Sequence, residues 1–289
     1  MKSVAFAPGH ISGFFEPVYF NQDMARTGSR GAGINISLGA LSEVVAENSS
    51  KQVFEFYVNG KKCNSPVVRL ALKYMLGQSP VHVVVRTKIQ LPFGQGFGMS
   101  SASALSATYA LSKIINVPCS EAMKASHFAE VQLKTGLGDV VASCFGGVEI
   151  RKEPGLPPWG VIEHIPGTFE LVLCVIGGKL ETKKILSDSS KANGIVEYGK
   201  YCTKKLLENP CIEHFFPLSQ IFTNKTGLAD KRVLEAIKSV DDFGMASMCM
   251  LGNSVFAVGK TSELCQILSK FGRVFVCNVD KVGACLLKE

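Results

Sequence analysis

A glycine-rich run at residues 92–106 holds the residue types best suited to chemistry in this chain. The run has the sequence PFGQGFGMSSASALS, in which three spaced glycines precede Ser100 and Ser101. Glycines let the main chain wrap closely around phosphate oxygens, and a hydroxyl at a helix start can donate to phosphate or ligate a phosphate-bound metal. The alternative interpretation is a glycine-rich connector followed by an ordinary serine N-cap.

The elements that flank this run would present it to an anion. Residues 81–91 alternate apolar and polar side chains, which predicts a half-buried strand that ends at Pro92. Apolar residues then recur at helical spacing from Ala104 to Ile114, so a helix is expected to begin near Ser100 or Ser101. The first N–H groups of a helix lack internal partners, and the helix dipole is positive at that end, so this order favours a phosphate site.

Two acidic residues further along the chain are the next candidates. Glu130 lies on a helix predicted to begin at Ser120, and Lys134 follows it one turn later. Asp139 stands between glycines and a run of apolar residues, which is an unusual place for a solvated charge. For Glu130, a surface ion pair with Lys134 at i,i+4 is the alternative to a functional role.

Two more segments combine glycines with polar side chains. Residues 1–7 predict a short strand, and residues 8–17 (PGHISGFFEP) predict a tight loop that contains His10. His10 is equally compatible with capping a turn and with a charged role. In residues 26–33 (RTGSRGAG), Arg26 and Arg30 suit a carboxylate or a phosphate, although a solvated hairpin turn is the alternative.

The overall composition excludes several classes of protein. The chain has 289 residues, is 46% hydrophobic and carries 31 Lys and Arg against 24 Asp and Glu, with the charges scattered, so nucleic-acid binding is not expected. The ten cysteines show no Cys-x-x-Cys spacing and mostly occur in apolar segments, as buried free thiols do. Without a signal sequence or an apolar run near the ~20 residues that span a bilayer, we expect a cytoplasmic protein that does not associate with membranes.

The remaining pattern predicts two domains, with a boundary in the proline-rich stretch after residue 155. The first domain (1–155) should alternate strands and helices, and the second (156–289) should end in a strand, a helix and a strand. The expected strands are 34–46, 52–58, 143–152 and 169–176, and the expected helices are 67–76, 181–187, 190–208, 212–226 and one around 264–271. A turn is expected at Asn59-Gly60.

Taken together, these motifs resemble those of the GHMP kinases. The family's glycine motif, Pro-x-x-x-Gly-Leu-Gly-Ser-Ser-Ala, aligns without a gap from Pro92, with Met99 at the first serine, Ser100 at the second and Ser101 at the alanine. Ala7-Pro8-Gly9 matches the family's opening motif, in which His10 stands at a lysine position. The family's third motif, a run of glycines, retains only Gly252 within residues 250–256.

The resemblance implies an α+β fold of two lobes and a reaction that uses ATP and Mg²⁺. The implied lobes are an N-terminal domain of the ribosomal S5 domain 2-like type and a ferredoxin-like C-terminal domain. Glu130 matches the family's Mg²⁺ ligand together with Ser100, and Asp139 matches the aspartate that takes the proton of the acceptor hydroxyl. The implied nucleotide-binding residues are Pro92, Gly94, Gly96, Gly98, Met99, Ser100, Ser101 and Ala102.

Within the family, three segments resemble one archaeal branch, whose enzymes phosphorylate the terminal hydroxyl of pantoate in coenzyme A synthesis. The segments are 6–15, 26–33 and 252–256. On this basis the implied substrate-binding residues are His10, Ser12, Arg26, Thr27, Ser29, Arg30 and Asn253. Our hypothesis is that Arg26 or Arg30 binds the carboxylate of the acceptor.

Two alternatives remain open from the sequence. The first is another small-alcohol kinase of the family, of the homoserine or mevalonate type. The second is a non-catalytic ligand sensor that keeps the fold, which the changed glycine motifs would permit, although Ser100, Glu130 and Asp139 argue against it. The sequence does not determine the oligomeric state, and it is compatible with a homodimer.

Overall fold

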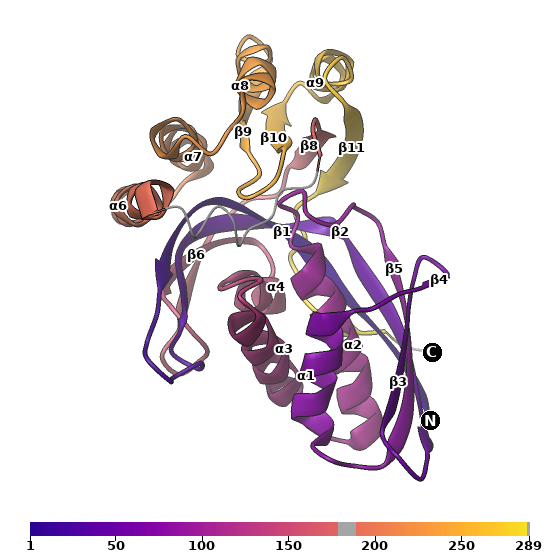
Figure 1. Cartoon of the computed structure of the whole chain (residues 1–289). Coiled ribbons are helices and arrows are strands. Elements are labelled where there is room, and N and C mark those ends of the chain that lie inside the picture. The colour runs from indigo at the N-terminus through magenta and orange to yellow at the C-terminus, as the bar shows by residue number, and fades with distance from the viewer. Residues whose placement is uncertain (179–188, 288–289) are drawn as a thin grey trace.

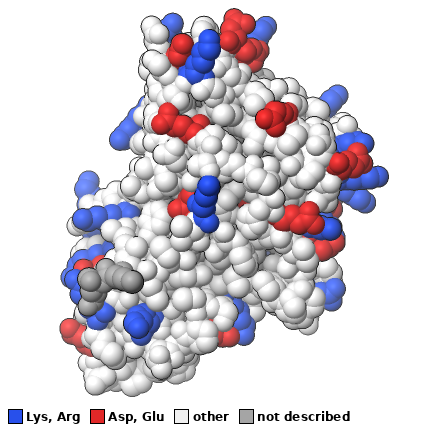
Figure 2. Space-filling view, turned by 180° about the vertical axis from the view of Figure 1, so that it is seen from behind, with Lys and Arg blue, Asp and Glu red and all other residues white. Residues whose placement is uncertain are grey.

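The computed structural model describes residues 1–178 and 189–287, which form two lobes joined along one side (Figure 1). The helix predicted at 181–187 lies outside the described residues. No helix in the described ranges is long and apolar enough to cross a membrane. Basic and acidic side chains are intermixed over the face that Figure 2 shows, as the scattered charges of the sequence predicted.

The first lobe is built on a strongly curved sheet. Its main path runs in the order β12-β1-β2-β5-β3-β4, and β6 pairs with β2 and with β7. The strands are β1 (Lys2–Val18), β2 (Gly28–Asn48), β3 (Val53–Val58), β4 (Lys61–Lys62), β5 (Val81–Ile89), β6 (Val148–Glu153), β7 (Val161–Ile165) and β12 (Cys285–Leu286). Four helices lie on its concave face: α1 (Pro66–Leu76), α2 (Met99–Ile115), α3 (Cys119–Leu133) and α4 (Asp139–Phe145).

The second lobe is a four-stranded antiparallel sheet with helices on one side. The strands β8 (Glu170–Val175), β9 (Gly244–Met248), β10 (Ser254–Gly259) and β11 (Arg273–Asn278) pair in the order β11-β8-β10-β9. The helices are α6 (Ser189–Glu208), α7 (Ile212–Thr226), α8 (Lys231–Lys238) and α9 (Thr261–Leu268). This strand order is that of a ferredoxin-like sheet, so the predicted α+β fold of two lobes is confirmed.

Two local predictions were wrong. Residues 8–17 are not a loop but the second half of β1, because register shifts at Pro8/Gly9 and Ser12/Phe14 let the strand keep pairing with β2. Residues 143–145 are the end of α4 rather than a strand, since Gly146 and Gly147, with φ of 70° and 72°, end the helix before β6.

The first sheet takes strands from both halves of the sequence. β7, which lies beyond residue 155, pairs with β6, and β12 near the C-terminus pairs with β1. Two strands that come after residue 155 thus complete the sheet of the first lobe. The division into two domains at this residue stays a prediction.

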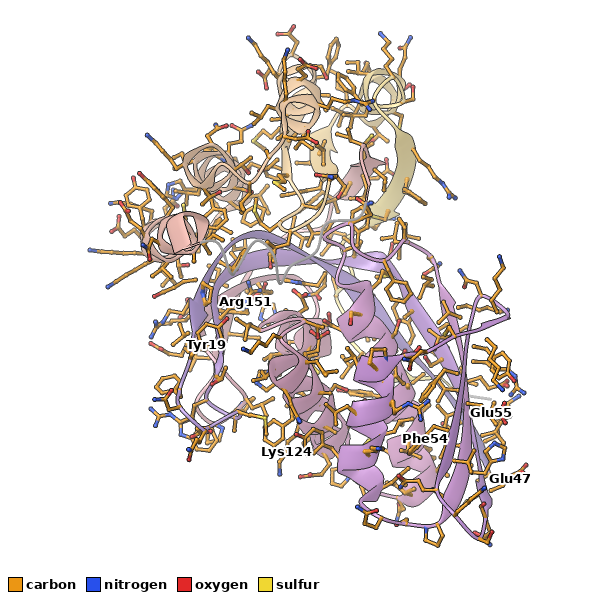
Figure 3. The ribbon with its side chains drawn as sticks, in the orientation of Figure 1. Tyr19, Glu47, Phe54, Glu55, Lys124 and Arg151 are labelled. Carbon is orange, nitrogen blue, oxygen red and sulfur yellow. The ribbon has the colours of Figure 1, made fainter. Side chains whose placement is uncertain are left out.

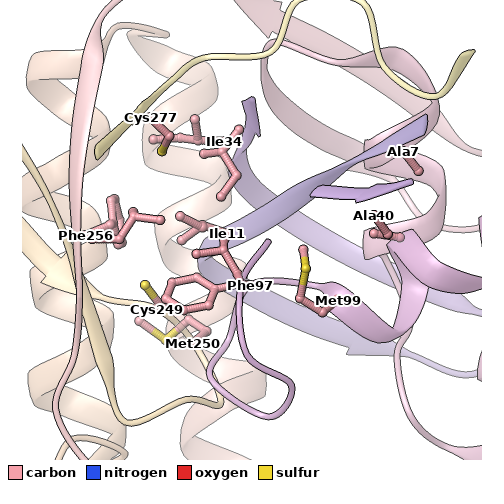
Figure 4. Packing of buried hydrophobic residues seen from close by; sticks show 14 of the residues in the cluster. Ala7, Ile11, Ile34, Ala40, Phe97, Met99, Cys249, Met250, Phe256 and Cys277 are labelled. Atoms are coloured by element: carbon pink, nitrogen blue, oxygen red, sulfur yellow. The ribbon is translucent and has the colours of Figure 1, made fainter. Parts of the chain in front are cut away.

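A continuous hydrophobic core joins the lobes. Phe97, beside Ile11 in the first lobe, lies against Cys249 and Met250 of the second (Figure 4). Aromatic pairs between β1 and α7 extend this contact, with ring centroids 5.9 Å apart for Phe14 and Phe215 and 5.7 Å apart for Phe15 and Phe222. Such packing fixes the lobes against each other, so the space between them is preformed.

The cysteines are free, as predicted, although fewer are buried than expected. Cys174, Cys202, Cys249 and Cys277 are buried, Cys63 is exposed, and the other five are partly buried. Burial raises the pKa of the Cys202 thiol to about 12, which makes it a packing residue rather than a nucleophile.

Candidate active site

The glycine-rich run forms a loop between β5 and α2, in the order that the sequence predicted. Gly98 caps the helix with φ of 62°, a left-handed conformation that side chains disfavour, and α2 begins at Met99. Ser100 and Ser101 therefore lie in the first turn, where backbone N–H groups are free to meet an anion.

The degenerate third motif packs against this loop. A Cβ atom at Gly252 would lie 2.0 Å from the carbonyl carbon of Gln95, so the two backbones approach too closely for a side chain. The Ser254 hydroxyl donates to the carbonyl of Gln95, whose side chain donates to the Gly177 carbonyl at 3.0 Å. Gly252, the glycine that remains in this motif, thus allows the second lobe to pack closely against the loop and to support it.

A cavity of about 710 Å³ opens beside the loop. Most of the predicted nucleotide-binding residues line it: Gly94, Gly96, Gly98, Met99, Ser100 and Ser101. Pro92 and Ala102 are not among the lining residues, and Ala102 is fully buried. The predicted phosphate site is therefore open to a ligand along most of its length.

One end of the cavity, which the sequence did not reveal, suits a flat ring. Val58, Pro66, Val67, Val68 and Phe93 line it with apolar surface. These residues lie in β3, at the start of α1 and in the glycine loop, so only the fold brings them together. Their individual sequence positions carry no signal of this role.

Glu130 projects from α3 toward the start of α2 and is buried. The Ser101 hydroxyl donates to Glu130 Oε2 at 2.7 Å, and a Cβ atom at Gly136 would lie 2.0 Å from the same oxygen. Burial, followed by the negative charge of Asp139, raises the pKa of Glu130 to about 7. The alternative surface pair with Lys134 is not formed, because Glu130 is 2% exposed whereas Lys134 is exposed and lines the cavity.

The surroundings of Glu130 fit a divalent cation. Burial and then the charge of Asp139 raise the pKa of Glu130, a shift that a bound cation would oppose, and the Ser100 hydroxyl lines the cavity beside it. Mg²⁺ is commonly held by one or two protein oxygens together with phosphate oxygens and water. Glu130 and Ser100 therefore match the donor set that Mg²⁺ with a nucleotide would use.

His10 connects the cavity to a buried network of charges. Its Nδ1 lies 2.8 Å from Asp139 Oδ1, and its Nε2 lies 2.8 Å from Glu149 Oε1. Arg151 donates to Glu149, and its Nη2 donates to the Ser12 hydroxyl at 3.3 Å. Figure 3 labels Arg151 on the curved end of the first sheet, beside α3 and α4.

The contacts within the network shift the pKa values of His10 and Asp139. Burial alone would lower the pKa of His10, but the hydrogen bonds and charges of Asp139 and Glu149 outweigh it and raise the pKa. For Asp139, burial acts to raise the pKa, but the His10 hydrogen bond, then the charges of His10 and Arg151, lower it overall. Both shifts favour the charged forms of the pair, and the Asp139 side chain is 30% exposed.

Glu149 and Arg151 were missed by the sequence analysis. Both lie on β6, whose residues Val148–Arg151 are all buried. Residues at i and i+2 in a strand point to the same face, so the spacing indicated that the charges of Glu149 and Arg151 lie on one side of the strand. Because four of the six residues of β6 are charged, the sequence did not show that this pair is buried.

The predicted acceptor-binding residues divide into two groups. His10, Ser12 and Ser29 line the cavity close to Asp139. Arg26, Thr27, Arg30 and Asn253 do not line it. Their role in binding the acceptor remains a prediction.

The residues of the second group have partners of their own. Arg26 stacks on Phe20 at 4.3 Å from the ring centroid, and Arg30 donates to Glu153 at 2.9 Å. The Thr27 hydroxyl donates to the carbonyl of Phe20 at 3.2 Å, and Asn253 donates to the carbonyl of Gly178 at 3.0 Å.

Comparison with known proteins agrees with this geometry. Residues 64–147 match the family model described as the GHMP kinases N terminal domain. The chain is similar to the pantoate kinase of Methanocaldococcus jannaschii, with 34% identity that covers 95% of this chain and 99% of that protein. It is also 34% identical to the pantoate kinase of Methanospirillum hungatei, with 99% of this chain and 96% of that protein covered.

Solved structures show the same fold. A phosphotransferase related to the coenzyme A biosynthesis pathway superposes with a TM-score of 0.91 at 28% identity, over 99% of each chain. A homoserine kinase from Cytophaga hutchinsonii superposes with a TM-score of 0.71 at 15% identity, over 99% of this chain and 97% of that one. The loop geometry, the cavity and these relatives together lead to one conclusion: the chain belongs to the GHMP kinases and, within them, to the family of the pantoate kinases.

Proposed function

We propose that this protein transfers the terminal phosphoryl group of ATP to the 4-hydroxyl of (R)-pantoate, a step of coenzyme A biosynthesis. The observation that carries the proposal is the Asp139–His10 pair, with 2.8 Å between Oδ1 and Nδ1, in the same cavity as the glycine loop. A phosphate site and an ionised carboxylate in one cavity are what transfer to an alcohol requires. Relatives named pantoate kinase across nearly the whole chain support the acceptor.

The nucleotide would lie along the first lobe. The apolar end of the cavity at Val67 and Phe93 suits the base, while Gly96, Gly98 and the first turn of α2 face the phosphates. Glu130 and Ser100 would hold Mg²⁺, which when bound neutralises charge on the phosphate oxygens. This arrangement directs the terminal phosphate toward Asp139.

Asp139 would receive the acceptor hydroxyl. One oxygen, Oδ1, accepts from His10, so the second carboxylate oxygen is available to the cavity. As the new O–P bond forms and the bond to the ADP oxygen breaks, the hydroxyl proton passes to Asp139. A carboxylate with a lowered pKa is sufficient because the hydroxyl oxygen becomes acidic once it bonds to phosphorus.

The carboxylate of the acceptor would bind near Ser12 and Ser29. The Ser12 hydroxyl accepts from Arg151, and a Cβ atom at Gly138 would lie 2.3 Å from Ser29 Oγ and 2.8 Å from Arg151 Nε. Arg151 Nε has no hydrogen-bond partner among the described residues. Arg151, like Arg26 and Arg30, does not itself line the cavity, but its buried guanidinium lies directly behind two hydroxyls that do, which favours an anion there.

The test is release of ADP from MgATP with pantoate, homoserine and mevalonate supplied separately. Turnover with pantoate alone is the expected result. Turnover only with homoserine or mevalonate would assign the chain to another small-alcohol kinase of the family. Binding of ATP without turnover on any acceptor would instead favour the ligand-sensor alternative.

A further inference from the structure

We infer that Glu149 is a positioning residue for phosphoryl transfer, which holds the His10 ring charged and aligned so that His10 in turn orients Asp139. Glu149 is fully buried on β6 and does not line the cavity, so it acts through His10 rather than on substrate. This inference rests on the proposed function, because it assigns Asp139 to the reacting hydroxyl.

The two contacts of the His10 ring define its protonation. Each ring nitrogen lies 2.8 Å from a carboxylate oxygen, Asp139 on one side and Glu149 on the other. A neutral imidazole carries one N–H group and can donate in only one direction. Arg151 Nη1 also lies 3.3 Å from Nε2 and would donate to that nitrogen in a neutral ring, but only a ring with protons on both nitrogens donates to both carboxylates, which lie closer. Without Glu149, a neutral ring with its proton on Nδ1 would satisfy Asp139.

A gap in the central strand makes this contact possible. β2 lies between β1 and β6, and Gly33 of β2 pairs with Ser12 on one side and with Glu149 on the other. A Cβ atom at Gly33 would lie 2.3 Å from His10 Nε2. The ring therefore reaches across β2 through the space that a side chain would fill. Gly33, noticed in the sequence only as part of a glycine-rich turn, has this specific role.

The other charges around His10 support a fixed cation. Asp139 faces the ring from α4, and Glu149 and Arg151 face it from β6. β2 and the glycine loop face it with Gly33 and Gly98, which carry no side chains. Arg151 donates to Glu149, so the cluster contains two acidic side chains, Asp139 and Glu149, and two basic ones, His10 and Arg151. The charge of Glu130 on α3 acts on Asp139 from the far side.

The competing explanation is that Glu149 and Arg151 only stabilise the curved sheet. Loss of a purely structural partner would lower the amount of folded protein, and the remaining folded enzyme would keep its normal turnover and pH profile. Loss of a positioning residue would lower kcat and change the pH profile, because His10 would then lose its proton in the neutral range.

The first measurement is nitrogen-15 NMR of the histidine rings in the wild-type protein, with the His10 signals assigned by comparison with His10→Gln. We expect both His10 nitrogens to be protonated at pH 7.5. A neutral His10 ring at that pH would overturn the inference. The NMR measurement does not depend on turnover. Inactivity of the wild type with pantoate would therefore count against the proposed function alone.

The second measurement compares kcat of Glu149→Gln with that of Glu163→Gln. Glu163 lies on β7, where it pairs with Lys152 at the exposed surface, so it is a matched control. We expect Glu149→Gln to lower kcat by about 10- to 100-fold, as loss of an outer hydrogen-bond partner commonly does, with the KM for ATP unchanged. The loss should deepen as the pH rises through about 6.5, the ordinary pKa of histidine.

A lysine at position 10 provides the rescue. The double variant His10→Lys/Glu149→Gln should lose the pH dependence in the neutral range, since the ordinary pKa of lysine is about 10.4 and Asp139 remains beside it. A Glu149→Gln enzyme with wild-type kcat and pH profile would overturn the inference, and so would a loss that is uniform over pH and unchanged by His10→Lys. If Glu149→Gln does not fold, the protonation of His10 measured by NMR in the wild type decides whether the inference stands.

Discussion

The two ends of the cavity are built in opposite ways. At the phosphate end, residues that are consecutive in the chain, from Gly94 to Ser101, present backbone N–H groups and two hydroxyls. At the acceptor end, His10, Asp139 and Arg151 come from β1, α4 and β6 and meet as charged side chains. A site made of backbone depends on local conformation, whereas a site made of buried charges depends on the complete sheet.

This difference sets how each end should fail. Apart from Ser100, the proposed Mg²⁺ ligand, the phosphate end should tolerate changes of side chain but not an added Cβ atom where two backbones meet, as at Gly252. The acceptor end should fail when a single oxygen or nitrogen is changed, because each buried charge there has few partners. Glu130 lies between the two ends, and the charge of Asp139 contributes to its raised pKa.

The largest effect is expected at the acceptor end, from Asp139→Asn. An amide cannot accept the hydroxyl proton, so kcat should fall by about 10²- to 10⁴-fold while the affinity for ATP is retained. Steady-state ADP release and a separate nucleotide-binding titration measure the two quantities. Near-full turnover of this variant would show that Asp139 is not the proton acceptor.

Arg151→Lys separates the two candidate sites for the acceptor carboxylate. Lysine keeps the charge but loses the planar fork, and a charge-assisted hydrogen bond contributes about 1.5–3 kcal/mol, so the KM for pantoate should rise by roughly 10- to 100-fold. The matched control is Arg30→Lys, whose arginine pairs with Glu153 outside the cavity. Equal effects of the two substitutions would restore Arg30 as a carboxylate ligand.

Glu130→Gln tests the junction between the two ends through the pH dependence of stability. The pKa of Glu130 is raised from 4.5 to about 7, so the folded protein binds the extra proton and its free energy of unfolding falls as the pH rises between these values. The variant lacks this cost. Without divalent cations it should be more stable than the wild type at pH 8, by at most about 3 kcal/mol, and similar to it near pH 4.5.

Urea unfolding at pH 5 and pH 8 measures that difference. Glu121→Gln on the same helix is the control, since Glu121 is exposed and pairs with Lys124. A Glu130→Gln variant that is destabilised equally at both pH values would contradict the raised pKa. Turnover should also need more Mg²⁺ in Glu130→Gln, because one of its two proposed protein ligands is weakened.

The smallest of the four effects concerns the backbone contact behind the phosphate end. Gly252→Ala forces a Cβ atom against Gln95 and should lower stability by about 1–3 kcal/mol, with weaker ATP binding as the loop shifts. Gly178→Ala is the control, because a Cβ atom there meets nothing within 4 Å. Thermal unfolding with and without MgATP measures both effects, and equal stability of the two variants would show that the loop does not need this brace.

Prediction from sequence was strong where structure is local. The strand before the loop and the start of α2, with Ser100 and Ser101 in its first turn, follow from periodicity and helix-start signals, which need only neighbouring residues. The error at residues 8–17 has a tertiary cause. Glycine and proline there favoured a loop, but pairing with β2 kept the chain extended with bulges at two points.

The acceptor site shows most clearly what could not be predicted from the sequence. Ser12 and Ser29 were predicted to bind the acceptor and line the cavity, whereas Arg26 and Arg30, chosen with them, found partners elsewhere. Arg151 was not chosen, because nothing near it in the sequence shows that its strand lies beside His10. The partner of a buried arginine depends on which strands are adjacent in the sheet. The spacing of neighbouring residues in the sequence does not show which strands are adjacent.

By itself, the sequence of this protein determined the family and predicted the phosphate loop and the roles of Ser100, Glu130 and Asp139, because these predictions depend on residue types at fixed short spacings. Only the tertiary structure decided that His10 lies between two carboxylates, that Glu149 reaches it past Gly33, and that Gly252 braces the loop. The physical reason is that a buried charge takes its state from every group around it, and those groups come together only when distant strands pair.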